Sequence, residues 1–253
     1  MATKINLLLS KIPAGGLVFS AYMTANGIST KEQTNYVRSE WIDRMAQGVY
    51  YRRGNKPTLY SSIFSYNEQL GKHCYVGATT ALDIAGFSHF VAMGKPTAYL
   101  FTTKAERLPK WFLLHDWDMA VAYSTTKVFG DSTLGVMPTM VAGNELWVSS
   151  PERAIMECLN LSPTYFSLMD IYYIMEMLTT LRPKLVQQLL ESCTSVKIKR
   201  LFLLMAEKSG HAWFGALDLS NVDLGEGKRA LAPNGQYNAK YRITVPTELN
   251  DYE

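Results

Sequence analysis

The sequence predicts an α+β fold in which an N-terminal winged helix-turn-helix is followed by a mixed α/β C-terminal domain. Three short helix signals and then a hairpin signal occupy the chain up to about residue 60. Beyond them, strand and helix signals are mixed, and 253 residues are enough for two domains. We place the boundary so that residues 1–92 form the first domain and residues 93–253 form the second.

The positive charge of the chain is concentrated in the first domain. Up to Leu70 the chain carries eight Lys and Arg but only four Asp and Glu, whereas its formal net charge is only +3. An excess of Lys and Arg confined to one segment is typical of proteins that bind nucleic acid. The distribution therefore favours a nucleic-acid partner for the first domain.

The cysteines and the first residues of the chain favour a cytoplasmic protein without a membrane partner. Cys74, Cys158 and Cys193 lie far apart and show no Cys-x-x-Cys spacing, which disfavours a disulfide framework or a zinc site. The run "INLLLSKI" at residues 5–12 is too short and too polar to be a signal peptide or a membrane span.

Two short helices are expected before the basic segment. Apolar residues recur at helical spacing from Ile5 to Ile12, which predicts an amphipathic helix that Pro13 ends. A second short helix is expected from Ser20 to Asn26, with Gly27 as its C-terminal stop.

A third helix is expected directly after Ser29. Ser29 with Glu32 three residues later forms a capping box, which marks the start of a helix. At ~100° per residue, Val37 and Trp41 fall on one side of this helix, with Gln33 nearby. That side is expected to face the core.

The opposite side of the third helix predicts a DNA-reading surface. Lys31, Asn35 and Arg38 form a polar, basic stripe there, and their side chains are long enough to reach base edges. Thr34 and Tyr36 flank the stripe and are expected to reach phosphates or bases. A solvated charged helix is the alternative interpretation of the same pattern.

The segment "QGVYYRRGNKPTLY" (residues 47–60) predicts a hairpin that serves as the wing. Two short strand signals stand on either side of Gly54-Asn55-Lys56-Pro57, so the tip of the hairpin is expected to be basic. Tyr51, Arg52, Arg53 and Lys56 are the expected wing contacts, because a wing needs cations that approach phosphates.

The remainder of the chain shows alternating helix and strand signals without an internal repeat. Helices are expected within residues 75–87, 149–161, 165–181, 182–193 and 195–210, and strands at residues 97–103, 145–150 and 241–245. Pro151 stands at a first helical position, which is where proline is favoured.

No catalytic constellation emerges from the residues. The pair His115-Asp116 has no further ligand at a convincing spacing, and "LGEGKRAL" (residues 224–231) lacks the spacing of a phosphate loop. Cys158 and Cys193 sit in apolar helical patterns that indicate core positions. We therefore expect no enzyme, no metal and no cofactor. A metal-dependent hydrolase that uses His115 and Asp116 is the rival hypothesis.

A second basic cluster lies in the C-terminal half. It consists of Lys197, Lys199 and Arg200 before an apolar run, and of Lys228 and Arg229 in a Gly-rich tail. Cations in the first turn oppose the helix dipole, which favours a partner surface over a solvated helix end. Spacing alone leaves both interpretations open.

Several separated motifs resemble the AbiEi-type antitoxins of type IV, or abortive infection, toxin–antitoxin systems. In the N-terminal run the matching residues are Gly27-Ile28-Ser29, Tyr36, Ser39, Trp41 and Gly48-Val49-Tyr50. Glu40 stands where that family often has Gly, and Ile42 replaces Leu. The C-terminal half matches at "ERLPKWF", "SSPERAIMECL", residues 181–213, "LGEGKRAL" and "KYRITVP". Together the motifs span nearly the whole chain.

The resemblance implies a non-enzymatic antitoxin that represses its own operon. The winged helix would bind repeats in the double-stranded promoter DNA, and the C-terminal domain would antagonise a cognate nucleotidyltransferase-like toxin. Antagonism in such systems needs no stable complex. We expect the antitoxin surface to comprise Lys197, Lys199, Arg200, Lys228 and Arg229. A stand-alone winged-helix regulator whose C-terminal domain binds a ligand or a protein is the alternative.

Overall fold

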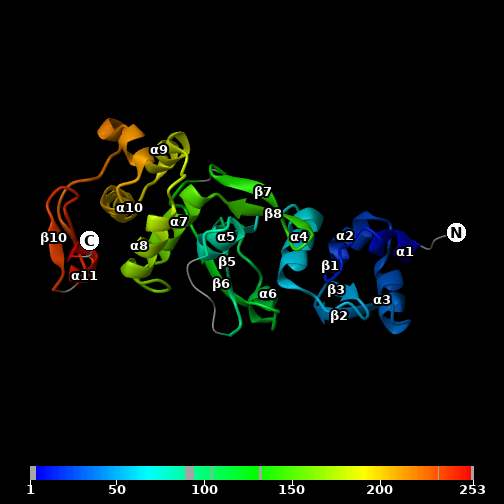
Figure 1. The fold of residues 1–253 in the computed structure, drawn as a ribbon. Coiled ribbons are helices and arrows are strands. Elements are labelled where there is room, and N and C mark those ends of the chain that lie inside the picture. The colour runs from blue at the N-terminus through cyan, green and yellow to red at the C-terminus, as the bar shows by residue number, and fades with distance from the viewer. Residues whose placement is uncertain (1–3, 89–93, 104, 131–132, 233, 252–253) are drawn as a thin grey trace. The chain divides into compact units, whose positions relative to one another are not determined.

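The computed structural model describes residues 4–88, 94–103, 105–130, 133–232 and 234–251 (Figure 1). The chain forms two compact units, each built from several separate segments of the sequence. The first unit comprises Met1–Tyr75, Met93–Thr125 and Pro138–Trp147, and the second comprises Val76–Ala92, Thr126–Met137 and Val148–Glu253. The expected boundary between residues 92 and 93 lies outside the described residues and stays a prediction.

The first unit begins with the element order of a winged helix-turn-helix, as predicted. The elements are α1 (Lys4–Leu9), β1 (Leu17–Phe19), α2 (Ser20–Ala25), α3 (Thr30–Arg38), β2 (Ile42–Ala46) and β3 (Val49–Arg52). The three strands form an antiparallel sheet in the order β1-β3-β2. Apolar side chains from the helices and the sheet form one core, which contains Ile5, Leu8, Leu9, Val18, Met23, Ile28 and Ile42.

The predicted capping box begins α3. The backbone N–H of Ser29 donates to a Glu32 carboxylate oxygen at 2.7 Å, and the N–H of Glu32 donates to the Ser29 hydroxyl at 3.3 Å. Two of the free donors at the helix N-terminus are thereby satisfied. The helix begins at Thr30, as the pattern predicted.

A buried glutamine joins α3 to α2. The Gln33 side chain is only 2% exposed. Its Oε1 accepts from the Ser20 hydroxyl at 2.7 Å, and its Nε2 donates to Thr24 Oγ1 at 3.1 Å and to the Ile28 carbonyl at 3.2 Å. A buried amide with its donors and acceptor satisfied fixes one geometry, so Gln33 sets the angle at which α2 presents α3.

The predicted position of the hairpin is wrong. The turn lies at Gln47-Gly48 between β2 and β3, and Gly48 has the positive φ of 71° that such a turn requires. The segment around Gly54 to Pro57 instead leads out of β3 into a helix. Thr58, which was expected in the second strand, is the N-cap of that helix, α4 (Leu59–Leu70).

Helix α4 covers the free edge of β1. The backbone N–H of Leu17 donates to the Ser65 hydroxyl at 3.0 Å, and that of Phe19 donates to Gln69 Oε1 at 3.0 Å. Gln69 Nε2 in turn donates to the Leu17 carbonyl at 2.7 Å. An edge strand left open is a site of unwanted pairing, and these polar side chains close it.

A second, five-stranded sheet follows in the order β6-β5-β4-β8-β7. Its strands are β4 (Tyr75–Val76), β5 (Thr97–Thr102), β6 (Ala120–Thr125), β7 (Val136–Val141) and β8 (Asn144–Ser149), and the short helix α6 (Lys110–Leu114) lies between β5 and β6 in sequence. Strand β5 pairs with β6 in parallel, and β4 pairs with β8 in parallel. The predicted strands at residues 97–103 and 145–150 are therefore present.

The second unit is mainly helical, with a small sheet near its end. Its helices are α5 (Ala78–Ile84), α7 (Pro151–Leu161), α8 (Leu168–Met177), α9 (Pro183–Ser192), α10 (Val196–Lys208) and α11 (Thr247–Asp251). Two 3₁₀ helices, η1 (Ala212–Ala216) and η2 (Leu219–Asn221), lead into β9 (Arg229–Ala230), β10 (Gln236–Asn238) and β11 (Ile243–Val245), in the order β10-β11-β9. The five predicted helices and the final strand are confirmed, with ends that differ by a few residues.

Candidate nucleic-acid interface

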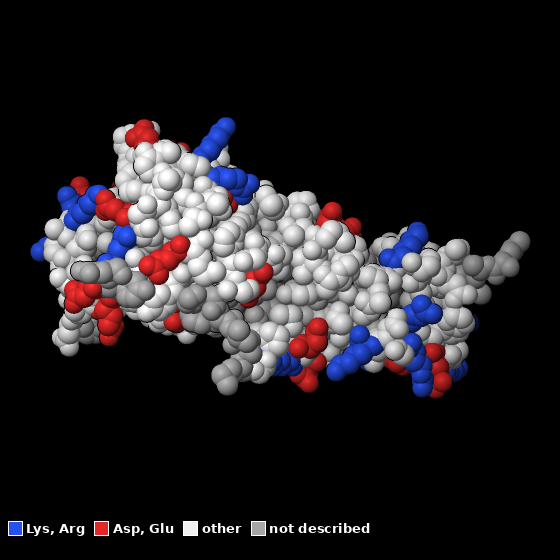
Figure 2. All heavy atoms as spheres, in the orientation of Figure 1, with Lys and Arg blue, Asp and Glu red and all other residues white. Residues whose placement is uncertain are grey.

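Helix α3 presents the predicted polar stripe to solvent. Lys31, Thr34, Asn35 and Arg38 are all exposed on it. In Figure 2, Lys and Arg side chains gather over the region that carries α1–α3 and the hairpin in Figure 1, with acidic side chains among them. The structure thus places these four side chains on one accessible helix face.

Two aromatic residues near α3 lie differently from what the helical pattern predicted. Tyr36 is half-buried and packs against the core of the winged helix, so its ring contributes to folding. Trp41 was expected on the buried side, but it follows the end of α3 and is 42% exposed. Its backbone N–H donates to the Tyr36 carbonyl at 2.9 Å, which holds the turn between α3 and β2.

The cations that were predicted at the wing tip lie elsewhere. Arg52 pairs with Ile42 at the open end of the hairpin, Arg53 follows the strand, and Lys56 lies in the loop before α4. The tip at Gln47-Gly48 is about 13 Å from Arg52 along an extended strand. The predicted basic tip is therefore wrong, although all three cations are exposed.

The structure adds one cation to the hairpin that the sequence pattern missed. Arg44 is exposed on β2, opposite Tyr50, and its Nε donates to the Ala46 carbonyl at 3.3 Å beside the tip. Alternation along Ile42–Ala46 gives no signal for an exposed Arg44, because residues two apart share a strand face and Ile42 is buried. Tyr51 is half-buried opposite Leu17.

A cavity of about 400 Å³ opens beside the C-terminal end of α3. Its lining comes from α1, from the turn after α3 and from the end of β3, and comprises Asn6, Leu9, Ser10, Ser39, Glu40, Trp41, Arg52 and Arg53. The Glu40 carboxylate forms an ion pair with Arg53, with 2.8 Å between Glu40 Oε1 and Arg53 Nη1. Glu40 has a φ of 64°, a left-handed conformation that costs a side-chain-bearing residue ~1 kcal/mol or more.

Sequence profiles of one family match both halves of the chain. Residues 1–93 match the profile described as "Transcriptional regulator, AbiEi antitoxin N-terminal domain". Residues 95–246 match the one described as "Transcriptional regulator, AbiEi antitoxin, Type IV TA system". The chain belongs to the AbiEi antitoxin family. The resemblance inferred from the motifs is thereby confirmed, and DNA and a toxin are the general classes of partner that the family description implies.

A solved structure shares the fold of this AbiEi-family chain. The crystal structure of the Rv2827c protein from Mycobacterium tuberculosis superimposes with a TM-score of 0.64 over 97% of this chain and 92% of that chain, at 14% identity. At this identity the likeness concerns the fold alone. No curated protein matches the sequence. Within the described residues, no helix has both the length and the apolar character needed to cross a bilayer.

The second basic cluster of the AbiEi-family chain does not form one surface. Lys199 and Arg200 are 5% and 1% exposed, so their assignment to the antitoxin surface is wrong. Lys197 is half-buried, and its Nζ donates to the Ser162 carbonyl at 2.5 Å. Lys199 and Arg200 lie on α10 and are buried. Later segments of the chain, between residues 224 and 242, pack over Arg200. Lys228 and Arg229 are exposed.

Arg200 organises the tail from inside. Its guanidinium donates to the carbonyls of Leu224 at 2.8 Å, Gly225 at 3.0 Å, Gly227 at 2.9 Å and Arg242 at 2.9 Å. The planar fork of arginine suits several acceptors at once. Arg200 therefore holds the segments that carry the exposed cations Lys228 and Arg229, without itself reaching solvent.

The residues of the hydrolase hypothesis do not assemble a metal site. Asp116 is exposed and pairs with Lys95 Nζ at 2.6 Å, while the His115 ring packs against Trp117 at 4.4 Å between centroids. Burial lowers the pKa of His115. Over the described ranges, no group of three or more His, Cys, Asp or Glu side chains is arranged to hold a metal ion.

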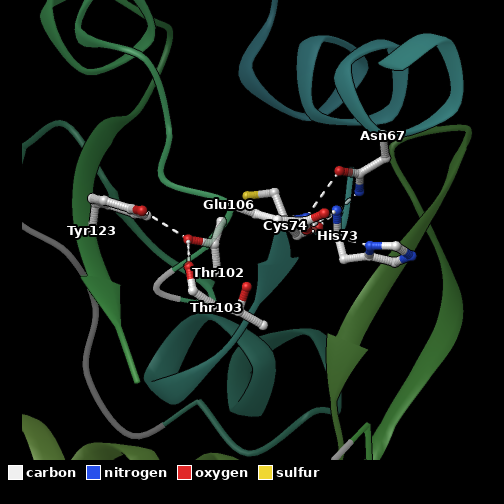
Figure 3. A network of polar contacts seen from close by, with 7 residues as sticks. All are labelled: Asn67, His73, Cys74, Thr102, Thr103, Glu106 and Tyr123. Atoms are coloured by element: carbon white, nitrogen blue, oxygen red, sulfur yellow. Dashed lines mark hydrogen bonds and ion pairs between the residues drawn. The ribbon is translucent and has the colours of Figure 1, made fainter. Parts of the chain in front are cut away.

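A polar network in the first unit contains residue types that occur in enzyme sites, and its contacts are structural (Figure 3). The Asn67 amide donates to the Cys74 carbonyl at 2.7 Å and accepts from its N–H at 2.9 Å, which joins α4 to β4. The Thr102 and Tyr123 hydroxyls lie 2.7 Å apart between β5 and β6. Burial raises the pKa of the Cys74 thiol to about 12, so it is not a thiolate nucleophile at neutral pH.

Proposed function

We propose that this chain represses its own toxin–antitoxin operon by binding promoter repeats through the winged helix of residues 1–92. We further propose that the C-terminal domain of residues 93–253 antagonises a cognate nucleotidyltransferase-like toxin, without catalysis and without need of a stable complex. The observation that carries the DNA part is the exposed stripe of Lys31, Asn35 and Arg38 on a helix that Gln33 fixes in place.

The stripe has the chemistry of a base reader. Arginine and asparagine side chains can each make two hydrogen bonds to one base, to guanine and adenine respectively, and lysine reaches guanine or a phosphate. Helix α3 spans Thr30–Arg38, and an α-helix with its side chains is about 10–12 Å across, which fits the width of the major groove at about 12 Å. A reading helix must not tilt, and the buried amide of Gln33 restrains its angle to α2.

The test is a titration of the full chain with the duplex upstream of its own gene, at two salt concentrations, against a scrambled duplex of equal length. The full chain is required because the first unit includes residues after 92. Preferential binding to the native duplex supports the proposal. Equal binding to both duplexes, or to neither, would refute repression through this helix.

Arg44 is expected to contact phosphate as part of the wing, because it lies beside the hairpin tip. Its replacement by Ala should reduce the slope of log K against log salt by roughly one unit, since one fewer counterion is released. Arg52→Ala and Arg53→Ala should each do the same if these residues contact phosphates at the hairpin base. Lys110→Ala, an exposed cation on α6, is the matched control and should leave the slope unchanged. If a variant keeps the wild-type slope of log K against log salt, the replaced residue does not contact phosphate.

Lys228 and Arg229 are the exposed cations proposed for antitoxicity. The double variant Lys228→Gln, Arg229→Gln is expected to reduce rescue of toxin-expressing cells at equal protein level, because it removes two exposed charges of the tail and keeps the hydrogen bonds of the Arg200 guanidinium. Lys127→Gln, Lys184→Gln removes the same charge elsewhere in the second unit and should rescue fully. Full rescue by the tail variant would contradict the assignment.

A further inference from the structure

The cavity beside α3 has the side chains of a phosphate site. Arg52 and Arg53 supply guanidinium groups, and the Trp41 ring supplies a flat apolar face. The hydroxyls of Ser10 and Ser39 also line the cavity, but each donates to a backbone carbonyl, at Leu7 and Asn35 respectively. Guanidinium groups suit phosphate because their fork matches two of its oxygens. An exposed indole ring suits the sugar or base that a nucleotide phosphate carries. A volume of about 400 Å³ has room for such a group.

An anion of the chain itself already lies at this site. The Glu40 carboxylate pairs with Arg53 at 2.8 Å, although the side chains of Glu40 and Arg53 are 66% and 49% exposed. An exposed pair of this kind is weak and can exchange. The backbone at Glu40 has a φ of 64°, which glycine would adopt freely. Glu40 thus has a strained backbone conformation, and its carboxylate pairs with Arg53 of the cavity.

The cavity is tied to the reading helix. The N–H of Arg53 donates to the Trp41 carbonyl at 3.2 Å, and the N–H of Trp41 donates to the Tyr36 carbonyl of α3 at 2.9 Å. Arg38, the last residue of α3, is two positions before Glu40. If α3 enters the major groove, its C-terminal end and this cavity approach a phosphate strand that borders the groove.

We propose that this cavity binds a nucleotide phosphate at Arg53, with its sugar or base against Trp41, and that the Glu40 carboxylate occupies the phosphate position until it is displaced. The phosphate has two possible sources, the backbone of the operator and a free mononucleotide. The first source rests on the proposed DNA binding, whereas the second does not. Glu40 thereby sets the affinity of the site.

The first arm titrates the operator duplex over a range of salt with the full chain, Glu40→Gln, Arg53→Ala and the double variant. Glu40→Gln is expected to bind about threefold more tightly or better, because the competing anion is gone, and with a salt slope about one unit steeper. Both gains should vanish in the Arg53→Ala background. Glu68→Gln, an exposed glutamate on α4, adds the same charge and should change little. Glu40→Gly, which also removes the strain, should bind like Glu40→Gln.

The second arm follows tryptophan fluorescence while adenosine monophosphate or inorganic phosphate is added. A saturable change that is stronger for Glu40→Gln and lost in Trp41→Phe supports a free nucleotide as the ligand. In the first arm, an equal gain in operator affinity from Glu68→Gln excludes the operator backbone as the source of the phosphate. A gain in operator affinity from Glu40→Gln that persists in the Arg53→Ala background excludes it as well. If no duplex binds at all, the proposed function fails and the second arm alone decides. A negative result in both arms overturns the proposal.

Discussion

Replacing Arg200 by Met is expected to lower the free energy of unfolding by about 3 kcal/mol, because the hydrogen bonds from one buried, charged donor to several backbone carbonyls are lost. Arg200 is 1% exposed, and its guanidinium donates to four carbonyls, at Leu224, Gly225, Gly227 and Arg242. Methionine fills much of the same volume but donates nothing. Urea denaturation followed by circular dichroism measures the loss.

The matched control is Arg229→Met, which makes the same chemical change at an exposed position of the same tail. Its effect on stability should stay within about 0.5 kcal/mol. Arg200→Lys should recover little, because an ammonium group cannot reach four carbonyls that a planar fork spans. Equal stability of Arg200→Met and wild type would show that the tail does not depend on Arg200.

The second large effect is expected on DNA. The combined variant Lys31→Ala, Asn35→Ala, Arg38→Ala should lose about 3 kcal/mol or more of operator affinity, at roughly 1–3 kcal/mol for each base contact. Its affinity for a scrambled duplex should fall much less, because non-specific binding depends on charge. A titration of both duplexes at one salt concentration measures the two losses.

Two controls separate reading from charge and from folding. The double variant Arg107→Ala, Lys110→Ala removes two exposed cations elsewhere in the first unit and should keep its preference for the operator. The thermal melting of the α3 variant should stay close to wild type, because the replaced side chains are exposed and alanine favours helix. Equal losses on both duplexes would mean that α3 contributes charge and reads no base.

Local signals in the sequence determined where α3 begins. Ser29 and Glu32 are three residues apart, and the hydrogen bonds they make belong to a single helical turn, so no distant segment is needed. Pro151 at the start of α7 acts through its own fixed φ in the same way. The polar stripe of α3 is equally local, because the period of a helix sets which residues share a face.

The hairpin and α4 could not be placed by local pattern. Strand β3 is the central strand of its sheet, so its limits depend on pairing with the distant β1 as well as with the neighbouring β2. In α4 the buried face carries Ser61, Ser62 and Ser65, which hides the apolar stripe that predicts a helix. Ser65 meets the edge of β1 and Ser61 meets the loop before it, whereas the buried Ser62 hydroxyl has no hydrogen-bond partner among the described residues.

By itself, the sequence determined the family, the winged-helix order and the exposed stripe of α3, because capping, helical period and motif order all act over short stretches of chain. Only the tertiary structure decided whether the other cations are buried, ion-paired or exposed. Arg200 is interior because carbonyls some 24 to 42 residues further along fold over it. Arg53 meets Glu40 because strand pairing brings the end of β3 back to the turn after α3. Burial and ion pairing join distant residues, and no local pattern records them.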